Sequence, residues 1–405
     1  MKNLFRKKYI FLKFNAILFI GLIFLLANTK NSFANKSSLK LKINDIEENL
    51  AYSTLADWFE FTPYLITDNS YDSEIENINY YQNQEDICLL TNSLQDKYHI
   101  QKNVHFSVNE SSIAFYVSTL SQKVNKNTKD AKIKFNEETE KVEIDFPEND
   151  GLSLNIPEST QIIIDTITAN TELPENVELS YKIEKADVRS DNLKSLGINK
   201  LVGEGKSNFH GSTKTRIHNI KTAVNKFDGL LLKPEEEFSF VDTLGPVDGE
   251  SGYKEELVIK KDETVKEFGG GICQVSTTTF RAAIYSGLAI TARRNHAYPV
   301  HYYAPQGMDA AIYLPKPDLK FVNNTPNHIL VQVEIKEDTN DLFFRFYGTS
   351  DKRKVEVKGP FVTEKNPDGS MRTYFTQKVF DKNGELVIDE VFRSFYASPD
   401  KYPRS

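Results

Sequence analysis

Three consecutive glycines lead directly into a cysteine in the segment Gly269-Gly-Gly-Ile-Cys273. Side chains that could face a core then recur at helical spacing, at Val275, Thr279, Phe280, Ala283, Ile284 and Leu288. This spacing predicts an amphipathic helix that begins at the cysteine and buries one face. The glycines permit backbone conformations that are closed to other residues, and they allow a substrate to approach the backbone closely.

The position of Cys273 at the start of this helix bears on its chemistry. A helix N-terminus presents unpaired N–H groups and a partial positive charge. Both favour a thiolate over a thiol, so we expect the pKa of Cys273 to be lowered. The segment therefore predicts a nucleophilic cysteine. The alternative is a structural cysteine, because cysteine is among the residue types that are most often buried.

The first 34 residues have the pattern of an export signal. Basic side chains precede an apolar run over residues 16–27, and Ser32-Phe-Ala34 ends in the small residues that a signal peptidase prefers. An uncleaved membrane anchor is the alternative, since residues 9–27 are nearly long enough to span a bilayer. In either case the sequence predicts that the rest of the chain lies outside the cytoplasmic membrane.

Charge and cysteine content exclude several classes of protein. Loss of residues 1–34 lowers the 50 lysines and arginines to 44 and leaves all 57 acidic side chains, which gives a net charge of −13. A nucleic-acid partner would require a basic face, so none is predicted. The chain has only two cysteines, Cys88 and Cys273, and is therefore not a disulfide scaffold. Cys88 lies in an apolar segment and is interpreted as a buried thiol.

At 405 residues the chain is long enough for two or three domains. Helical and strand patterns alternate along it, which predicts an α+β fold. The elements predicted in the first half are helices over residues 109–124 and 157–168 and a hairpin over residues 131–146. Residues 201–212, rich in Gly, Ser and Asn, predict a linker. A helix over residues 216–227 opens the second unit, and turns after residue 350 predict small β-hairpins appended to the core.

Several short motifs occur in order between residues 206 and 350. They are Thr215-Arg-Ile-His-Asn-Ile220, Phe238-Ser-Phe240, Gly252-Tyr253, Gly269-Gly-Gly-Ile-Cys-Gln-Val-Ser-Thr-Thr278, Asn295-His296, Pro299-Val300, Gly307-x-Asp-Ala310 and Pro317-Asp-Leu-Lys-Phe321. In this combination the region resembles the VanW-like domain family. The preceding region, especially residues 130–209, resembles the peptidoglycan-binding module often found ahead of VanW or L,D-transpeptidase domains.

The resemblance implies a division of the chain into four segments. These are a signal peptide or membrane anchor (1–34), an α+β peptidoglycan-binding module (35–205), a VanW-type α+β domain (206–350) and a β-hairpin extension (351–405). It also implies an extracytoplasmic cell-wall protein whose partners are peptidoglycan stem peptides, with membrane contact only through an uncleaved N-terminal segment. Some VanW-domain proteins are L,D-transpeptidases, which cross-link the diamino acids of adjacent stems. Others have no assigned activity, and the family name comes from glycopeptide-resistance clusters.

The resemblance also implies roles for individual residues. Cys273 would be the nucleophile, His296 or alternatively His218 its base, and Asp309 the residue that orients the imidazole. Many relatives carry His-x-His where this chain has Arg294-Asn-His296, so the retained histidine is favoured as the base. The candidates for oxyanion stabilisation or substrate binding are Gly270, Gly271, Gln274, Arg216, His218 and Asn219. Arg216 and Asn219 either bind the substrate carboxylate or hold the domain together.

Phosphate chemistry and a metal centre are not predicted. The glycines are not followed by Gly-Lys-Ser/Thr, as a phosphate loop requires, and no Cys-x-x-Cys or His-Glu-x-x-His motif is present for zinc. We expect no cofactor, although Cys273, His296 and His301 could meet in space and bind a metal. A non-catalytic wall-binding or scaffold protein and a hydrolase that uses the same cysteine are the competing hypotheses. The sequence makes no prediction of oligomeric state.

Overall fold

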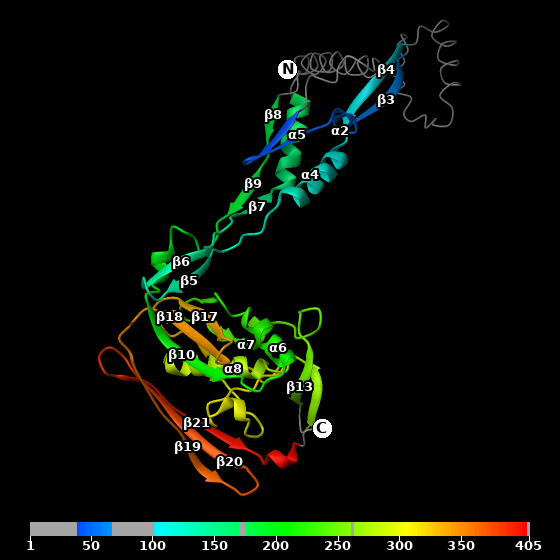
Figure 1. Ribbon diagram of the computed structural model, residues 1–405. Coiled ribbons are helices and arrows are strands. Elements are labelled where there is room, and N and C mark those ends of the chain that lie inside the picture. Colours follow the sequence, from blue (N-terminus) through cyan, green and yellow to red (C-terminus); the bar gives the residue numbers. More distant parts are fainter. Residues whose placement is uncertain (1–38, 67–100, 170–174, 261–262, 403–405) are drawn as a thin grey trace. The chain divides into compact units, whose positions relative to one another are not determined.

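The computed structural model describes residues 39–66, 101–169, 175–260 and 263–402 (Figure 1). The predicted export segment and Cys88 lie outside the described residues. The described residues form two compact units, one within residues 1–129 and 149–186 and the other within residues 130–148 and 187–405. We call them the N-terminal unit and the C-terminal unit. Both contain helices and strands, so the predicted α+β class is confirmed.

The N-terminal unit packs two helices against small sheets. Helix α4 (Glu110–Val124) begins after Asn109, whose side chain accepts a hydrogen bond from the Ser112 N–H at 2.9 Å, as an N-cap residue does. Helix α5 (Ile156–Ala169) packs beside it. Both helices lie close to their predicted ranges. The remaining elements are β1 (Lys40–Ile43), β2 (Ile46–Asn49), α2 (Tyr52–Ala56), β3 (Phe59–Ile66), β4 (Gln101–Val108), β7 (Gly151–Leu154), β8 (Asn176–Glu178) and β9 (Tyr181–Glu184), paired as β2-β1-β8, β3-β4 and β7-β9.

The C-terminal unit is built on an antiparallel sheet with the strand order β10-β18-β17-β11. These strands are β10 (Lys200–Asn208), β18 (Asp341–Gly348), β17 (Ile329–Lys336) and β11 (Leu231–Leu232). A second sheet has the order β12-β16-β15, with β12 (Glu237–Ser239), β16 (Lys320–Val322) and β15 (Ala289–Ala292). The C-terminal unit also contains β5 (Lys132–Asn136), β6 (Lys141–Phe146), η1 (Leu193–Leu196), α6 (Lys214–Val224), α7 (Phe240–Leu244), β13 (Glu255–Lys260), β14 (Glu263–Phe268), α8 (Ile272–Tyr285), η2 (His301–Tyr303) and η3 (Pro399–Lys401).

Two sequence predictions about the boundary between the units differ from the structure. The hairpin β5–β6 forms as predicted but belongs to the C-terminal unit, because the Phe135 ring stacks on Tyr347 with the ring centroids 4.6 Å apart. The predicted linker over residues 201–212 is wrong. Those residues form most of β10, which pairs with β18 along its whole length, and the glycines serve close packing instead of flexibility.

Helix α8, which carries Cys273, is the buried centre of the C-terminal unit (Figure 1). It packs on β10 and β18 and is also contacted by β15, η2 and β19. A side chain at Gly205 of β10 would lie 2.0 Å from the Thr278 carbonyl oxygen, so glycine is required for this close approach. Residues Gln274 to Ile284 are all buried. The prediction of one buried face is therefore too narrow, because the helix is covered on every side.

The C-terminal strands form a larger structure than the predicted small hairpins. Strands β19 (Lys354–Lys365), β20 (Met371–Phe380) and β21 (Leu386–Tyr396) make one three-stranded antiparallel sheet. The predicted turns at residues 366–369 and 382–384 join them. The sheet is part of the core: Phe375 meets Phe280 of α8 edge to face, and the Gln377 side chain donates to the Ile284 carbonyl at 2.8 Å.

Candidate active site

The glycine segment places Cys273 in the first turn of α8. Gly269 and Gly271 have φ angles of 87° and 115°, in the left-handed region that favours glycine. A side chain at Gly270 would lie 2.7 Å from Cβ of Glu256, so this position also accepts only glycine. Cys273 is half-buried, and its sulfur lies 3.5 Å from the Ile312 carbonyl oxygen. The local sequence thus forms a tight turn that presents a thiol at a helix start.

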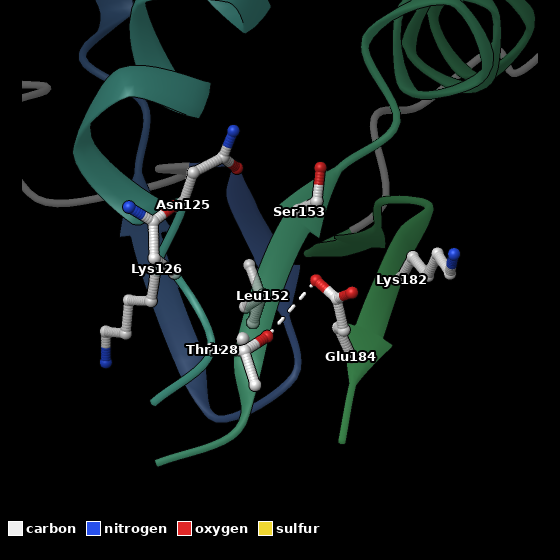
Figure 2. A pocket seen from close by; sticks show the side chains of 9 residues that line it. Asn125, Lys126, Thr128, Leu152, Ser153, Lys182 and Glu184 are labelled. Carbon is white, nitrogen blue, oxygen red and sulfur yellow. Dashed lines mark hydrogen bonds between the residues drawn. The ribbon is translucent and has the colours of Figure 1, made fainter. Parts of the chain in front are cut away.

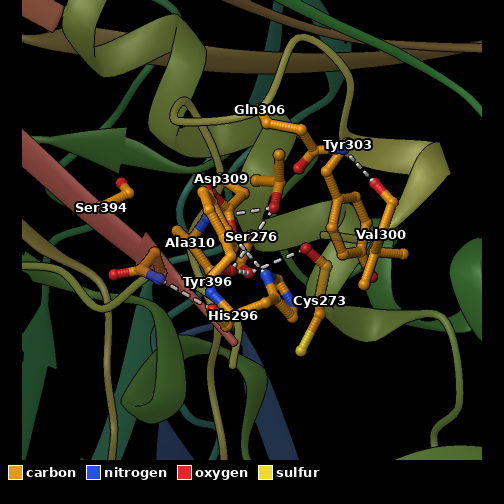
Figure 3. A network of polar contacts seen from close by, with 12 residues as sticks. Cys273, Ser276, His296, Val300, Tyr303, Gln306, Asp309, Ala310, Ser394 and Tyr396 are labelled. Carbon is orange, nitrogen blue, oxygen red and sulfur yellow. Dashed lines mark hydrogen bonds and ion pairs between the residues drawn. The ribbon is translucent and has the colours of Figure 1, made fainter. Parts of the chain in front are cut away.

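His296 lies beside Cys273 and is held by Asp309 (Figure 3). The His296 ring nitrogen Nδ1 is 2.6 Å from Asp309 Oδ2, and the His296 backbone N–H donates to the same oxygen at 2.8 Å. His296 is 6% exposed, and the Tyr303 ring packs against its imidazole with the ring centroids 4.4 Å apart. Its other nitrogen, Nε2, is buried and has no hydrogen-bond partner among the described residues. That nitrogen is available to a reacting group.

Asp309 is fully buried and receives hydrogen bonds from several donors. Besides His296 they are Arg293 Nη2, at 3.2 Å from Asp309 Oδ1, and the Tyr396 hydroxyl, which donates to the same oxygen. Burial alone would raise the pKa of Asp309, but the contact with His296 and the charge of Arg293 outweigh it and hold the pKa well below its usual range. Asp309 is therefore a permanent anion that fixes the tautomer and orientation of the imidazole.

The electrostatics of the Cys273–His296 pair favour a thiolate facing an imidazolium. Burial would raise the pKa of the Cys273 thiol, but the neighbouring His296 side chain and the charge of Arg216 lower it below its ordinary value. Burial would lower the pKa of His296, but Asp309 and Cys273 together raise it to about 9. Both shifts favour the charge-separated pair of thiolate and imidazolium over the neutral pair.

The residues after the site are held against α8 by hydroxyl groups of the helix. Ser276 donates to the Ala310 carbonyl at 2.5 Å, and Thr277 accepts from the Ala310 N–H at 3.1 Å. The buried Arg281 donates to the Met308 carbonyl at 3.0 Å and to the Tyr303 carbonyl at 2.6 Å. These bonds fix the segment that carries Asp309 and so fix its distance from Cys273.

The other predicted binding residues take different positions. Arg216 lies near Cys273 and donates to the Gln274 side-chain oxygen at 3.0 Å. The Gln274 amide donates to Ser207 at 3.2 Å, so its N–H₂ group is already engaged. Asn219 is buried and bonds the backbone of Lys254 and Gly270, which supports the structural alternative for this residue. His218 is bonded to the Gly252 carbonyl at 2.9 Å instead of to a member of the cluster.

Two backbone N–H groups at the start of α8 are engaged within the turn itself. The Ile272 N–H bonds the Gly269 carbonyl at 3.1 Å, and the Gln274 N–H bonds the Gly271 carbonyl at 3.0 Å. The N–H groups of Gly271 and Cys273 are the donors of this turn that remain as candidates for an oxyanion. The Gly270 carbonyl accepts a hydrogen bond from Asn219 at 3.2 Å, which orients the peptide that precedes Gly271.

The sequence did not identify Arg293, Tyr303 or Tyr396 as part of the site. Arg293 stands three residues before His296, but the first of two consecutive arginines gives no signal of burial. Tyr396 follows Asp309 by 87 residues and lies on β21, in the segment interpreted as an appended hairpin. Only the packing of the C-terminal sheet against α8 brings it to Asp309.

A polar groove lies within the N-terminal unit (Figure 2). It is formed by the chain after α4 and by strands β7 and β9. Its lining residues are Asn125, Lys126, Asn127, Thr128, Gly151, Leu152, Ser153, Lys182 and Glu184. The Thr128 hydroxyl donates to Glu184 at 3.1 Å, whereas the two lysines supply positive charge. No sequence motif pointed to this groove.

The described part of the chain contains no group of three His, Cys, Asp or Glu side chains that could hold a metal ion. No helix among the described residues is long and apolar enough to cross a membrane.

The fold and the site define an α+β protein with a Cys-His-Asp cluster at a helix start. Residues 215–347 match the family model described as "VanW like protein", and residues 72–185 match the one described as "Putative peptidoglycan binding domain". The chain thus carries a VanW-like domain preceded by a domain of the peptidoglycan-binding family, and the resemblance drawn from the sequence motifs is confirmed. The two family matches together indicate a cell-wall-associated protein.

Two curated relatives support the same assignment. Over 161 residues the chain is 34% identical to the uncharacterized protein YoaR of Bacillus subtilis (strain 168), covering 40% of this chain and 52% of that protein. Over 142 residues it is 27% identical to the vancomycin B-type resistance protein VanW of Enterococcus faecalis (strain ATCC 700802 / V583), covering 35% of this chain and 48% of that protein. The chain spans about half the length of the curated relatives it matches. No solved structure matches it.

Proposed function

We propose that this protein is an exported cell-wall enzyme, an L,D-transpeptidase that cross-links peptidoglycan stem peptides through Cys273. The observation that carries the proposal is the arrangement of half-buried Cys273 with buried His296 and Asp309, in which Nε2 of His296 adjoins the thiol. A nucleophile, a base and a group that orients the base are the parts that acyl transfer requires. The peptidoglycan-binding family match supports a peptide of the wall as the substrate.

The acylation step uses the charge-separated pair. The Cys273 thiolate attacks the carbonyl carbon between the diamino acid and D-Ala of a donor stem, and the oxyanion is stabilised by N–H groups of the helix start. The C–N bond then breaks, and the His296 imidazolium gives its proton to the departing D-Ala amine. A thioester on Cys273 and a neutral His296 remain. Asp309 keeps Nε2 directed at the reacting atoms throughout.

The transfer step reverses these roles. An amine of a neighbouring stem attacks the thioester carbonyl, and neutral His296 takes the proton that this amine loses. The new C–N bond forms as the C–S bond breaks, which regenerates the thiolate and the imidazolium. If water enters in place of the amine, the same steps give a hydrolase, so the acceptor decides between the two activities.

The N-terminal unit would hold the enzyme on its polymeric substrate. Its polar groove offers amide and hydroxyl groups and the ammonium groups of Lys126 and Lys182, which suit the acetamido and carboxylate groups of peptidoglycan. Binding to an insoluble polymer raises the local concentration of stem peptides at a tethered catalytic unit. The N-terminal residues that resemble an export signal are consistent with action outside the cytoplasmic membrane.

The test is direct detection of the acyl-enzyme. The full chain is incubated with a disaccharide-tetrapeptide, and intact-protein and peptide mass spectrometry are used to find an adduct on Cys273 and a cross-linked dimer. We expect both in the wild type, no adduct with Cys273→Ala, and a strongly reduced adduct with His296→Gln. The matched control is His218→Gln, which alters a histidine bonded outside the cluster and should behave as wild type.

The same experiment separates the competing functions. Release of a free tripeptide stem without a dimer would identify a hydrolase. The absence of any adduct on Cys273 while the protein still binds insoluble peptidoglycan would refute the enzymatic proposal and support a non-catalytic wall-binding or scaffold protein. The control is the thermal unfolding midpoint of Cys273→Ala. A midpoint equal to that of the wild type excludes misfolding as the cause of lost turnover.

A further inference from the structure

Arg216 occupies a distinctive position next to the thiol. It lies in the first turn of α6, and its Cγ is 3.1 Å from the place that a side chain on Gly271 would take. The guanidinium stacks over the Tyr302 ring, with the carbon Cζ 4.5 Å from the ring centroid, and donates one hydrogen bond to Gln274. Arg216 is thus held on two sides, and the glycine turn lets it pass directly beside the start of α8.

The charge of Arg216 is not neutralised by an ion pair. Among the described residues no carboxylate oxygen lies within 4.0 Å of it, and its buried Nε atom has no hydrogen-bond partner. Glu256 is close enough to feel its charge, but both Glu256 oxygens are already engaged, one by the Thr213 hydroxyl and the other by the Leu257 N–H. A guanidinium with an unpaired buried donor is costly unless something binds to it.

The place beside Arg216 is also bordered by His296. His296 Nε2 is buried without a partner, and His296 is 6% exposed. Arg216 and His296 both act electrostatically on Cys273, so the two unpartnered nitrogens belong to groups that flank one thiol. Protonated His296 can donate to the Cys273 thiolate, whereas the buried Nε of Arg216 is a donor that lacks an acceptor, so Arg216 is the group that requires one from a ligand.

We infer that Arg216 is a carboxylate-binding residue beside Cys273, and that the acyl donor is a peptide with a carboxylate close to the carbonyl that the thiol attacks. A planar guanidinium stacked on an aromatic ring presents its remaining N–H groups in a fixed fork, which matches the two oxygens of a carboxylate. This inference rests on the proposed function for the identity of the peptide, but the anion site itself does not depend on turnover.

In a stem peptide the carboxylate has two possible sources. One is the terminal carboxylate of the departing D-Ala, and the other is a free side-chain carboxylate of the diamino acid. Both present the same chemistry to Arg216. Donor tetrapeptides that are amidated at one position or the other distinguish them. Only amidation of the carboxylate that Arg216 binds should slow acylation of the wild type. With that amidated donor, Arg216→Gln should be acylated at the same rate as the wild type.

The test uses two alkylating reagents that differ by one charge. The full chain reacts with iodoacetate or with neutral iodoacetamide, and the rate of Cys273 modification is measured by mass spectrometry. We expect Arg216→Gln to lower the ratio of the iodoacetate rate to the iodoacetamide rate on the order of tenfold. Both reagents react with the thiolate, so the ratio of the two rates does not depend on the fraction of Cys273 that is deprotonated. Lys214→Gln, which removes an exposed charge from the same turn of α6, should leave the ratio unchanged.

A protection experiment on the wild type covers the case in which Arg216→Gln does not fold. N-acetyl-D-alanine should slow the iodoacetamide reaction of Cys273, whereas N-acetyl-D-alaninamide should not. An unchanged reagent ratio in a folded Arg216→Gln, or equal protection by acid and amide, would overturn the carboxylate site. If charge selectivity is present but no tetrapeptide forms an adduct, the carboxylate site stands and the transpeptidase proposal fails.

Discussion

The Tyr396 hydroxyl donates a hydrogen bond to Asp309 Oδ1, which joins the last strand of the C-terminal sheet to the carboxylate that holds His296. Burial and the charge of Asp309 raise the pKa of Tyr396, so the hydroxyl remains protonated and acts as a donor. Arg293 contacts the same oxygen and also donates to Ser394 of β21 at 3.0 Å. The C-terminal sheet is therefore part of the candidate site, and Arg293 and Tyr396 are positioning residues.

Replacement of Tyr396 by Phe should reduce activity while preserving the ring that fills the core. The variant removes one donor from a buried carboxylate, which costs about 1–3 kcal/mol in stability. Asp309 then holds the imidazole less firmly, and we expect Cys273 acylation to slow on the order of tenfold. The rate of adduct formation on Cys273 with the tetrapeptide measures the effect on acylation, and urea unfolding measures the effect on stability.

The matched control for this variant is Tyr374→Phe. Tyr374 is a half-buried tyrosine on β20 of the same sheet, and its ring packs on Phe361 with the centroids 5.2 Å apart. It should affect neither acylation nor the pH profile. A Tyr396→Phe enzyme with wild-type rates would show that the C-terminal sheet supports the fold without positioning Asp309.

The titration of His296 should reveal the buried imidazolium. The folded-state pKa of His296 is raised to about 9 from an ordinary value of 6.5, so its own stabilising contribution is complete below pH 6.5 and is lost as the pH rises through about 9. The Cys273 thiol releases a proton where His296 holds one, so the two contributions offset each other in the unfolding free energy near neutral pH. Nuclear magnetic resonance of the imidazole as the pH is raised therefore measures the shift of His296 itself. A His296 imidazole that titrates near 6.5 in the folded protein would mean that it is neutral at neutral pH.

Much of the local structure could be predicted from the sequence because its signals are local. The helix at 109–124 has an Asn cap and an apolar period, the hairpin at 131–146 alternates strictly, and the glycine–cysteine segment marks a helix start. The linker over residues 201–212 was wrong for a physical reason. Glycines in β10 are needed because α8 packs directly on the strand backbone, and composition alone does not separate that use from flexibility.

The candidate site was predictable only where its residues stand in motifs. Cys273, His296 and Asp309 could be selected because each lies in a short motif of the family resemblance, and the structure brings all three together. Tyr396 could not, since β21 reaches Asp309 only after the C-terminal sheet has packed on α8. His218 stands in such a motif as well, yet its position on α6 directs it to the Gly252 carbonyl.

The groove of the N-terminal unit gives a prediction about wall binding. Lys126 and Lys182 line it, and we expect the double variant Lys126→Ala/Lys182→Ala to bind purified insoluble peptidoglycan roughly fivefold to tenfold more weakly, as expected from the loss of charged hydrogen bonds. A sedimentation assay measures the bound fraction. Lys185→Ala is the control, because Lys185 is exposed but paired with Asp150 at 3.1 Å and does not line the groove. Equal binding by all three proteins would place wall recognition elsewhere.

The turn that presents Cys273 should be intolerant of a single methyl group. Gly271 has a φ of 115°, and an added Cβ would lie 3.0 Å from Ile220 Cγ1 and 3.1 Å from Arg216 Cγ. We expect Gly271→Ala to lose more stability than Gly211→Ala, a control with a φ of 79° and open space around the added atom, where backbone strain alone costs roughly 1–2 kcal/mol. Because the strained turn also carries the thiol and crowds Arg216, iodoacetamide labelling of Cys273 should slow in Gly271→Ala and stay unchanged in the control. If both variants lose the same stability and label at the same rate, the close packing of α6 on the turn has no part in presenting the thiol.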